Sequence, residues 1–292
     1  MNRLKQIQHN KRKTVVIVTG FILFVLFVGA ALTYSLYGEI FTGLLMALVI
    51  GGGYSAMMIF SSTNVVMRMN HAQEITERSQ NIQLWEMVDN MAMVARIEKP
   101  RLFIIKDNSP NAFATGTSPK NGAVAVTTGL LDHLNHDELE GVIAHEVAHI
   151  KNYDIRLSTI AVALVSAVAI LSDLGMRMMF FSRGGGNNKQ HPFVLILALA
   201  LVILSPLIAV LIQMAISRNR EYLADASAAE LTRNPEALAS ALQKITGVDT
   251  PVREASSSSA SLYFADPLKK KVSGLFSTHP DPTERIERLM NM

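Results

Sequence analysis

Long apolar stretches dominate the pattern of hydrophobic and polar positions along this chain. The first covers residues 14–38 and the second residues 40–67, and neither contains a charged residue. A third covers residues 157–181 and a fourth residues 191–217. Because a helix of about 20 apolar residues crosses a bilayer, the pattern predicts an integral membrane protein with about four transmembrane helices.

The third stretch leaves two interpretations open. Asp173 and Arg177 interrupt it four residues apart, so on a helix they can pair, or they can mark the end of a span. Residues 155–217 are therefore interpreted as two further transmembrane helices, or as an apolar hairpin packed on the neighbouring domain. The fourth stretch is long enough by itself to cross, which favours the first interpretation.

Residues 1–67 are predicted to form a basic N-terminal tail and two transmembrane helices. The tail contains lysine and arginine but no acidic residue before position 14, which places the N-terminus in the cytoplasm. The first apolar stretch is longer than the roughly 7–15 residues of a cleavable signal, so it is predicted to be an uncleaved anchor. After two crossings, the segment that begins at residue 68 is expected on the cytoplasmic side.

The segments outside the apolar stretches predict a mostly α fold with a small antiparallel β-sheet. Apolar spacing predicts a helix over residues 74–95, and β-branched runs predict strands over residues 102–105 and 123–127. Residues 111–114 lie between these two strands, and the arrangement suggests the small antiparallel sheet.

Beyond the fourth stretch, further helices are predicted over residues 217–231, over residues 235–245 and from Pro282 onward. The serine-rich residues 254–261 are predicted to form a mobile loop.

Composition then removes several classes of function. A net charge of +3, without a basic and aromatic-rich stretch, gives no support for a nucleic-acid partner. The chain has no cysteine, which excludes a disulfide scaffold, a thiolate metal site and a cysteine nucleophile. Any metal must therefore be held by histidine, aspartate or glutamate.

One short motif has recognisable chemistry. His145 and His149 are four residues apart, so on a helix they project from one face and can bind one zinc ion, with Glu146 beside them as a general base. Asn135 and Glu138 form a capping-box pattern ahead of an apolar periodicity, so the motif is predicted to lie on a helix. A surface helix with two incidental histidines would explain the spacing but not the apolar residues around it.

A catalytic zinc takes three protein ligands and one water. Glu221 and Asp225 are also four residues apart on a predicted helix, so one can bind the metal while the other supports a ligand histidine. A solvated pair beside Arg218 and Arg220 is the alternative. Two crossings between the histidines and Glu221, or a hairpin that does not cross, return both segments to one face of the membrane.

At these residues the sequence resembles the HtpX family of membrane-bound zinc metalloproteases, which are relatives of the CAAX prenyl proteases. The resemblance covers nearly the whole chain. The motifs that support it are residues 111–116, 128–131, 145–154, 217–225, 278–280 and 285–286.

The resemblance implies a gluzincin-type zincin domain in two parts. Residues 68–154 would contain the motif helix, and residues 218–292 would supply the third ligand. One zinc per chain would then be held by His145, His149 and Glu221.

The resemblance also implies roles for residues around the metal. Glu146 would be the general base, and Asp225 would orient a ligand histidine. His279 and Arg285 would lie near the active site as catalytic residues, possible stabilisers of an oxyanion. The edge-strand residues implied to bind the substrate backbone are Asn111, Ala112 and Phe113.

The activity implied is a zinc endopeptidase in the plasma membrane of a bacterium, a multi-pass protein with its active site in the cytoplasm. Its substrates would be damaged or misfolded membrane proteins, in protein quality control under stress. One alternative is a CAAX-type prenyl-protein protease, which generally needs a larger membrane chamber. Another is a non-proteolytic membrane scaffold or chaperone with structural zinc, which Glu146 disfavours because a structural site needs no general base. The sequence predicts no oligomeric state.

Overall fold

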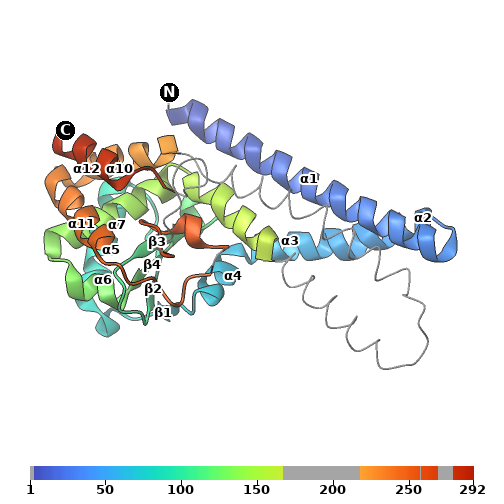
Figure 1. The fold of residues 1–292 in the computed structure, drawn as a ribbon, viewed down its shortest axis with the longest axis horizontal. Coiled ribbons are helices and arrows are strands. Elements are labelled where there is room, and N and C mark those ends of the chain that lie inside the picture. The colour runs from blue at the N-terminus through green and yellow to red at the C-terminus, as the bar shows by residue number, and fades with distance from the viewer. Residues whose placement is uncertain (1–2, 167–217, 257, 269–278) are drawn as a thin grey trace.

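The structure is a computed structural model, and it describes residues 3–166, 218–256, 258–268 and 279–292. A helical hairpin extends from a body that contains a small sheet and the remaining helices (Figure 1). The fold is mostly helical, as the sequence predicts.

The hairpin contains the first two apolar stretches. Helix α1 (Arg3–Tyr37) forms one arm and packs against a second helical run. That run consists of four segments, namely α2 (Phe41–Met46), the π-helical segment η1 (Ala47–Gly52), α3 (Gly53–Phe60) and α4 (Ser62–Met69).

Within the described ranges, no helix combines the length and hydropathy that a membrane crossing requires. The four predicted spans therefore stay a prediction. The third is described only as far as residue 166, and the fourth lies outside the described residues.

The sheet is mixed, so the prediction of an antiparallel sheet was wrong. Its strands are β1 (Gln73–Ile75), β2 (Arg101–Ile105), β3 (Ala112–Thr115) and β4 (Ala123–Thr127), in the order β1-β2-β4-β3. The two strands predicted from β-branched runs, β2 and β4, pair in parallel, while β1 and β3 add antiparallel edges. The chain between β2 and β4 crosses over and places β3 outside β4.

The predicted helix over residues 74–95 is shorter in the structure. Strand β1 occupies its start, a 3₁₀ turn η2 (Arg78–Gln80) follows, and helix α5 runs from Ile82 to Ala95. Asn81 caps α5 through its side chain, which accepts from the Leu84 backbone N–H. This cap explains the later start of the helix.

The other labelled helices of the body were all predicted from the sequence except α6. They are α6 (Thr128–His133), α7 (His136–Lys151), α10 (Arg218–Thr232), α11 (Pro235–Gly247) and α12 (Pro282–Met290). Two further 3₁₀ turns are η3 (Pro119–Asn121) and η4 (Ala260–Leu262). The capping box of Asn135 and Glu138 at the start of α7 is confirmed.

The sheet has an apolar core on each face because side chains alternate along its strands. Val124 and Val126 of β4 join the core formed with α5, α7 and α11, and Ala123 and Ala125 join the opposite core with α4 and Tyr263. Residues 154–166, which are helical, pack against α1 in a third cluster. The hairpin is therefore joined to the body through apolar contacts.

The described part of the serine-rich segment, residues 254–256 and 258–261, is hydrogen-bonded to the end of α4, and the mobile loop predicted there stays a prediction. Asn70, fully buried at the end of α4, accepts hydrogen bonds through its side-chain oxygen from Ser259 Oγ at 2.7 Å and Tyr263 Oη at 3.0 Å. The backbone N–H of Ser256 donates to the same oxygen at 3.3 Å. These bonds hold the described residues of the segment, which run beside the outer edge of β3.

Candidate metal centre

The motif helix α7 presents both histidines on the face that meets α10. His145 and His149 lie with their Nε2 atoms 3.0 Å apart. Helix α10 packs across α7 and places the Glu221 carboxylate 3.6 Å from His145 Nε2 and 3.7 Å from His149 Nε2. Among the described residues these three form the group that could hold a metal ion.

The spacing of these atoms fits a tetrahedral zinc ion. Zinc–ligand distances of about 2.0–2.1 Å put neighbouring ligand atoms roughly 3.3 Å apart. The three observed separations, 3.0, 3.6 and 3.7 Å, bracket that value. Two histidines and one glutamate leave one tetrahedral position for water, which is the pattern of catalytic rather than structural zinc sites.

Carboxylates behind the histidines orient the rings. His145 Nδ1 lies 2.9 Å from Asp225 Oδ1, a contact whose angle is not that of a hydrogen bond, and His149 Nδ1 lies 3.5 Å from Asp154 Oδ2. A carboxylate at Nδ1 favours the tautomer with its proton there, so that the Nε2 lone pair faces the metal position. The predicted position of Asp225 beside a ligand histidine agrees with this geometry. Asp154 has the equivalent place for His149, and its role was missed although it ends the same sequence motif.

Arg285 binds the Asp225 carboxylate inside the body. Its guanidinium is 1% exposed and donates from Nε and Nη2 to the two Asp225 oxygens at 2.9 and 2.8 Å, and from Nη1 to the Phe264 carbonyl at 3.0 Å. The aspartate and arginine thus neutralise one another inside the body. Burial alone would raise the pKa of Asp225, and the Arg285 charge lowers it overall.

Glu146 is the buried acid of the motif. It is 1% exposed on α7. Burial raises its pKa above the ordinary value, although the neighbouring histidines act in the opposite direction. A carboxylate with a raised pKa suits a group that must accept a proton and return it near neutral pH.

The ligand side chains influence one another strongly. Burial would lower the pKa of His149, but the carboxylates of Glu221 and Asp154 raise it to about 10. Burial would raise the pKa of Glu221, and the His149 charge instead holds it well below its usual value. The site therefore favours an ionised Glu221 carboxylate beside a positive charge at His149, which is the charge arrangement that a bound cation would satisfy.

The other predicted residues have partners inside the chain. His279 is buried, with Nε2 against the Tyr263 carbonyl, and burial lowers its pKa. Asn111 is fully buried, and its amide bonds to the Ala265 backbone. The catalytic and substrate-binding roles of these residues stay predictions.

Strand β3 is the edge of the sheet nearest the metal centre, and part of that edge is already paired. The Phe264 N–H donates to the Ala112 carbonyl at 2.8 Å, and Phe113 forms an antiparallel bridge with Tyr263. The Phe264 ring also meets the His145 ring edge to face at 4.9 Å. Sequence analysis missed this contact because Tyr263 and Phe264 form a single bridge rather than a strand, and a run this short has no period to recognise.

A narrow cleft opens beside the metal ligands. Its lining comes from four parts of the chain, namely Ala114 of β3, His149 of α7 with Asp154, Ile155 and Ser158 after it, Arg220 and Glu221 of α10, and Ser261 and Leu262. Its free volume is about 20 Å³, room for roughly one water molecule. Ala114 is therefore the β3 residue that faces the candidate metal site.

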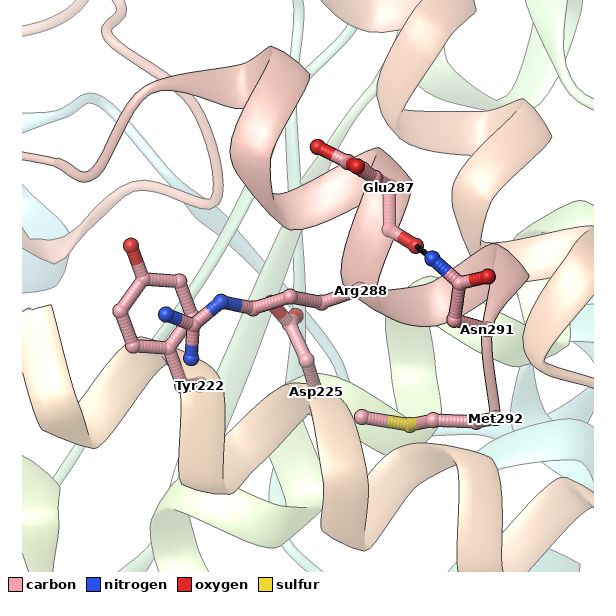
Figure 2. A pocket seen from close by; sticks show the side chains of 6 residues that line it. All are labelled: Tyr222, Asp225, Glu287, Arg288, Asn291 and Met292. Atoms are coloured by element: carbon pink, nitrogen blue, oxygen red, sulfur yellow. Dashed lines mark hydrogen bonds between the residues drawn. The ribbon is translucent and has the colours of Figure 1, made fainter.

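A separate groove of about 370 Å³ lies on the outer side of α10 and α12, and Figure 2 shows it. Arg288 covers the Tyr222 ring at 3.8 Å, with Asp225 beside them at the inner wall (Figure 2). Asp225 is 2% exposed, so its carboxylate is shielded from this groove. The groove is therefore separate from the cleft beside the ligands.

Comparisons with known proteins agree on one family. Residues 78–292 match the profile described as peptidase family M48. A protease HtpX homolog from Listeria monocytogenes is 56% identical, and one from Leuconostoc citreum is 50% identical, each over 99% of both chains. The crystal structure of Ste24p from S. mikatae is similar in fold, with a TM-score of 0.50 at 17% identity over 98% of this chain and 67% of that one.

Proposed function

The chain belongs to peptidase family M48, and we propose from this premise that it is a membrane-bound zinc endopeptidase. The observation that supports the proposal best is the convergence of His145, His149 and Glu221 within 4.8 Å of one another. The buried base Glu146 beside them distinguishes a hydrolytic site from a structural one.

Each residue of the centre has a defined task in this proposal. A zinc ion held by the three ligands would polarise water and the substrate carbonyl. Glu146 accepts a proton at its carboxylate and returns it to the leaving amine, for which its raised pKa is suited. Asp225 and Asp154 hold the two ligand rings in position. Arg285 acts through Asp225, since the hydrogen bonds of its guanidinium go to Asp225 and the Phe264 carbonyl.

The substrate is proposed to bind as an extended strand along the edge of β3. Backbone pairing of this kind gives affinity with little demand on sequence. Asn111, Ala112 and Phe113 were predicted to make these contacts, and their edge is paired here with residues 263–265. Ala114, which lines the cleft, is the position where an incoming strand would meet the metal ligands.

We further propose that the protein lies in the bacterial plasma membrane with this site on the cytoplasmic side. The uncharged stretches of the hairpin and the basic N-terminal tail support this orientation. Membrane proteins that are damaged or misfolded are the proposed substrates.

The decisive experiment compares purified wild type with the E146Q variant, each at a measured zinc content. Wild type should cleave casein and a membrane-protein substrate, and a zinc chelator should abolish cleavage. E146Q should bind one zinc per chain and cleave neither substrate. Unchanged turnover by E146Q would refute the assignment of the base. Preferential cleavage of a prenylated CAAX peptide would instead identify a prenyl-protein protease.

A further inference from the structure

Arg220 is a buried cation in the cleft beside the metal ligands. It precedes the ligand Glu221 on α10 and is 6% exposed. Its Nη1 donates to the Asp154 carbonyl at 3.1 Å and to Ser158 Oγ at 2.9 Å. Nε has no hydrogen-bond partner, and in the described part of the chain no carboxylate oxygen lies within 4.0 Å of the guanidinium.

Arg285 provides an internal comparison, because it is the same side chain buried in the same region. Each guanidinium uses Nη1 to bond a backbone carbonyl, Phe264 for Arg285 and Asp154 for Arg220. Arg285 then offers its Nε and Nη2 edge to Asp225 in two parallel bonds. The corresponding edge of Arg220 makes no such pair among the described residues.

A buried charge normally needs an opposite charge, since removing an ion from water is costly unless it is paired. The guanidinium fork matches a carboxylate in geometry, with two parallel N–H···O bonds. The cleft that contains Arg220 also contains His149, the β3 residue Ala114, and the carboxylates of Glu221 and Asp154, which face the ligand histidines. The missing carboxylate can therefore come from a molecule that enters this cleft.

We propose that Arg220 is a specificity-determining residue that binds a carboxylate of the substrate close to the cleaved bond. This inference rests on the proposed peptidase function and adds the chemical class of the substrate. The carboxylate belongs to an acidic side chain or to the C-terminus of the substrate. Because the free volume of the cleft is only about 20 Å³, binding separates residues 261–262 from β3.

The test uses the full-length, zinc-loaded protein and quenched fluorescent peptides based on one parent sequence, taken from a site that the protein cleaves in casein. In one arm, matched peptides carry either Gln or Glu at a single position, and each position within three residues of the cleaved bond is tested in turn. The other arm exchanges a C-terminal amide for a free carboxylate. Wild type should show a kcat/KM about 10 to 100 times higher for a carboxylate in one arm, as charge-assisted bonds to a buried fork predict.

Three variants separate recognition from structure. R220Q should lose the preference and still cleave the neutral parent peptide. R220K should keep only part of the preference, because an ammonium has the charge without the fork. The control R233Q removes an equal charge from an exposed residue just after α10, and it should leave the preference unchanged.

Equal cleavage of every matched pair by wild type would overturn the carboxylate site, and so would a preference that survives in R220Q. If R220Q cleaves nothing, the R220K variant is used instead. The ratio of kcat/KM for the carboxylate peptide to kcat/KM for its neutral match should be smaller in R220K than in wild type, and an equal ratio would overturn binding by the guanidinium fork. Absence of any cleavage by zinc-loaded wild type would contradict the peptidase function itself and remove the premise of this inference. Cleavage with no preference would leave the function standing and reject only the role of Arg220.

Discussion

Replacing Asp225 with alanine should destabilise the fold and weaken metal binding through two separable contacts. Arg285 is 1% exposed and directs two hydrogen bonds, 2.9 and 2.8 Å long, to the Asp225 carboxylate. Without that carboxylate the buried guanidinium keeps only the Phe264 carbonyl and a Glu221 oxygen 4.0 Å from Nη1, and breaking a buried pair in this way costs about 3–5 kcal/mol. Because folded domains are stable by only about 5–15 kcal/mol, D225A should show a large loss in the free energy of unfolding.

The second contact concerns the metal. Asp225 Oδ1 lies 2.9 Å from His145 Nδ1 and orients a ligand ring. Loss of such a partner typically lowers metal affinity by about 10- to 100-fold. The double variant D225L/R285M removes both charges and fills the space with apolar groups. It should recover much of the lost stability, but not the affinity for zinc.

Unfolding can be followed by the fluorescence of Trp85, the single tryptophan of the chain, which packs against the main core. Zinc affinity can be measured by competition with a chelator of known affinity. If D225A loses less than about 1 kcal/mol, the typical effect of an ordinary point substitution, the buried ion pair is not the main support of the site. If the double variant is no more stable than D225A, the unpaired charge is not the cause of the loss.

Two further predictions concern the supports of the body. N70A should destabilise the fold by about 1–3 kcal/mol, because it leaves the buried Tyr263 hydroxyl without its acceptor and leaves Ser259 Oγ with the Ser256 carbonyl alone. Limited proteolysis should then cut near residues 254–261, and an unchanged digestion pattern would contradict the anchor. For Glu138, burial would raise the pKa, but hydrogen bonds from Lys244, Ser240 and the Asn135 backbone lower it overall. A carboxyl group whose pKa is lowered in the folded state stabilises the fold at pH values above its ordinary pKa of 4.5. This contribution is lost as the pH falls through the pKa of the folded state. Unfolding measured from pH 7 to pH 3 should therefore show a smaller acid-induced loss in E138Q than in wild type, and equal slopes would argue against this contribution.

Local signals explain what sequence analysis predicted correctly. Helix α7 begins after Asn135 because the capping residue and Glu138 satisfy backbone groups at the helix start, and these two residues are only three positions apart in sequence. The histidine pair needs only the helical period to fall on one face. For the same reason α10, α11 and α12 were predicted with nearly correct bounds.

Pairing between distant segments explains what was missed. β2 and β4 were recognised as strands, but their parallel register depends on a crossover that places β3 at the outer edge, which no local pattern reports. The described part of the serine-rich segment is hydrogen-bonded to Asn70, which is 189 positions away from Ser259 in sequence. Arg220 and Arg285 are the same residue type near the same site, and only the structure shows which one has an acidic partner.

The electrostatics of the centre also explain why its two halves stabilise one another. Helix α7 places the side chains of His145 and Glu146 in the interior. The carboxylates that face His145 come from α10. Helix α10 supplies Glu221 and Asp225, and α12 supplies Arg285, which neutralises Asp225. Burying polar and ionisable groups without such partners is costly. The packing of α7 into the core and the docking of α10 and α12 against it are therefore energetically coupled. Formation of the ligand set is therefore part of the folding of the body, and binding of a cation at His145, His149 and Glu221 adds directly to its stability.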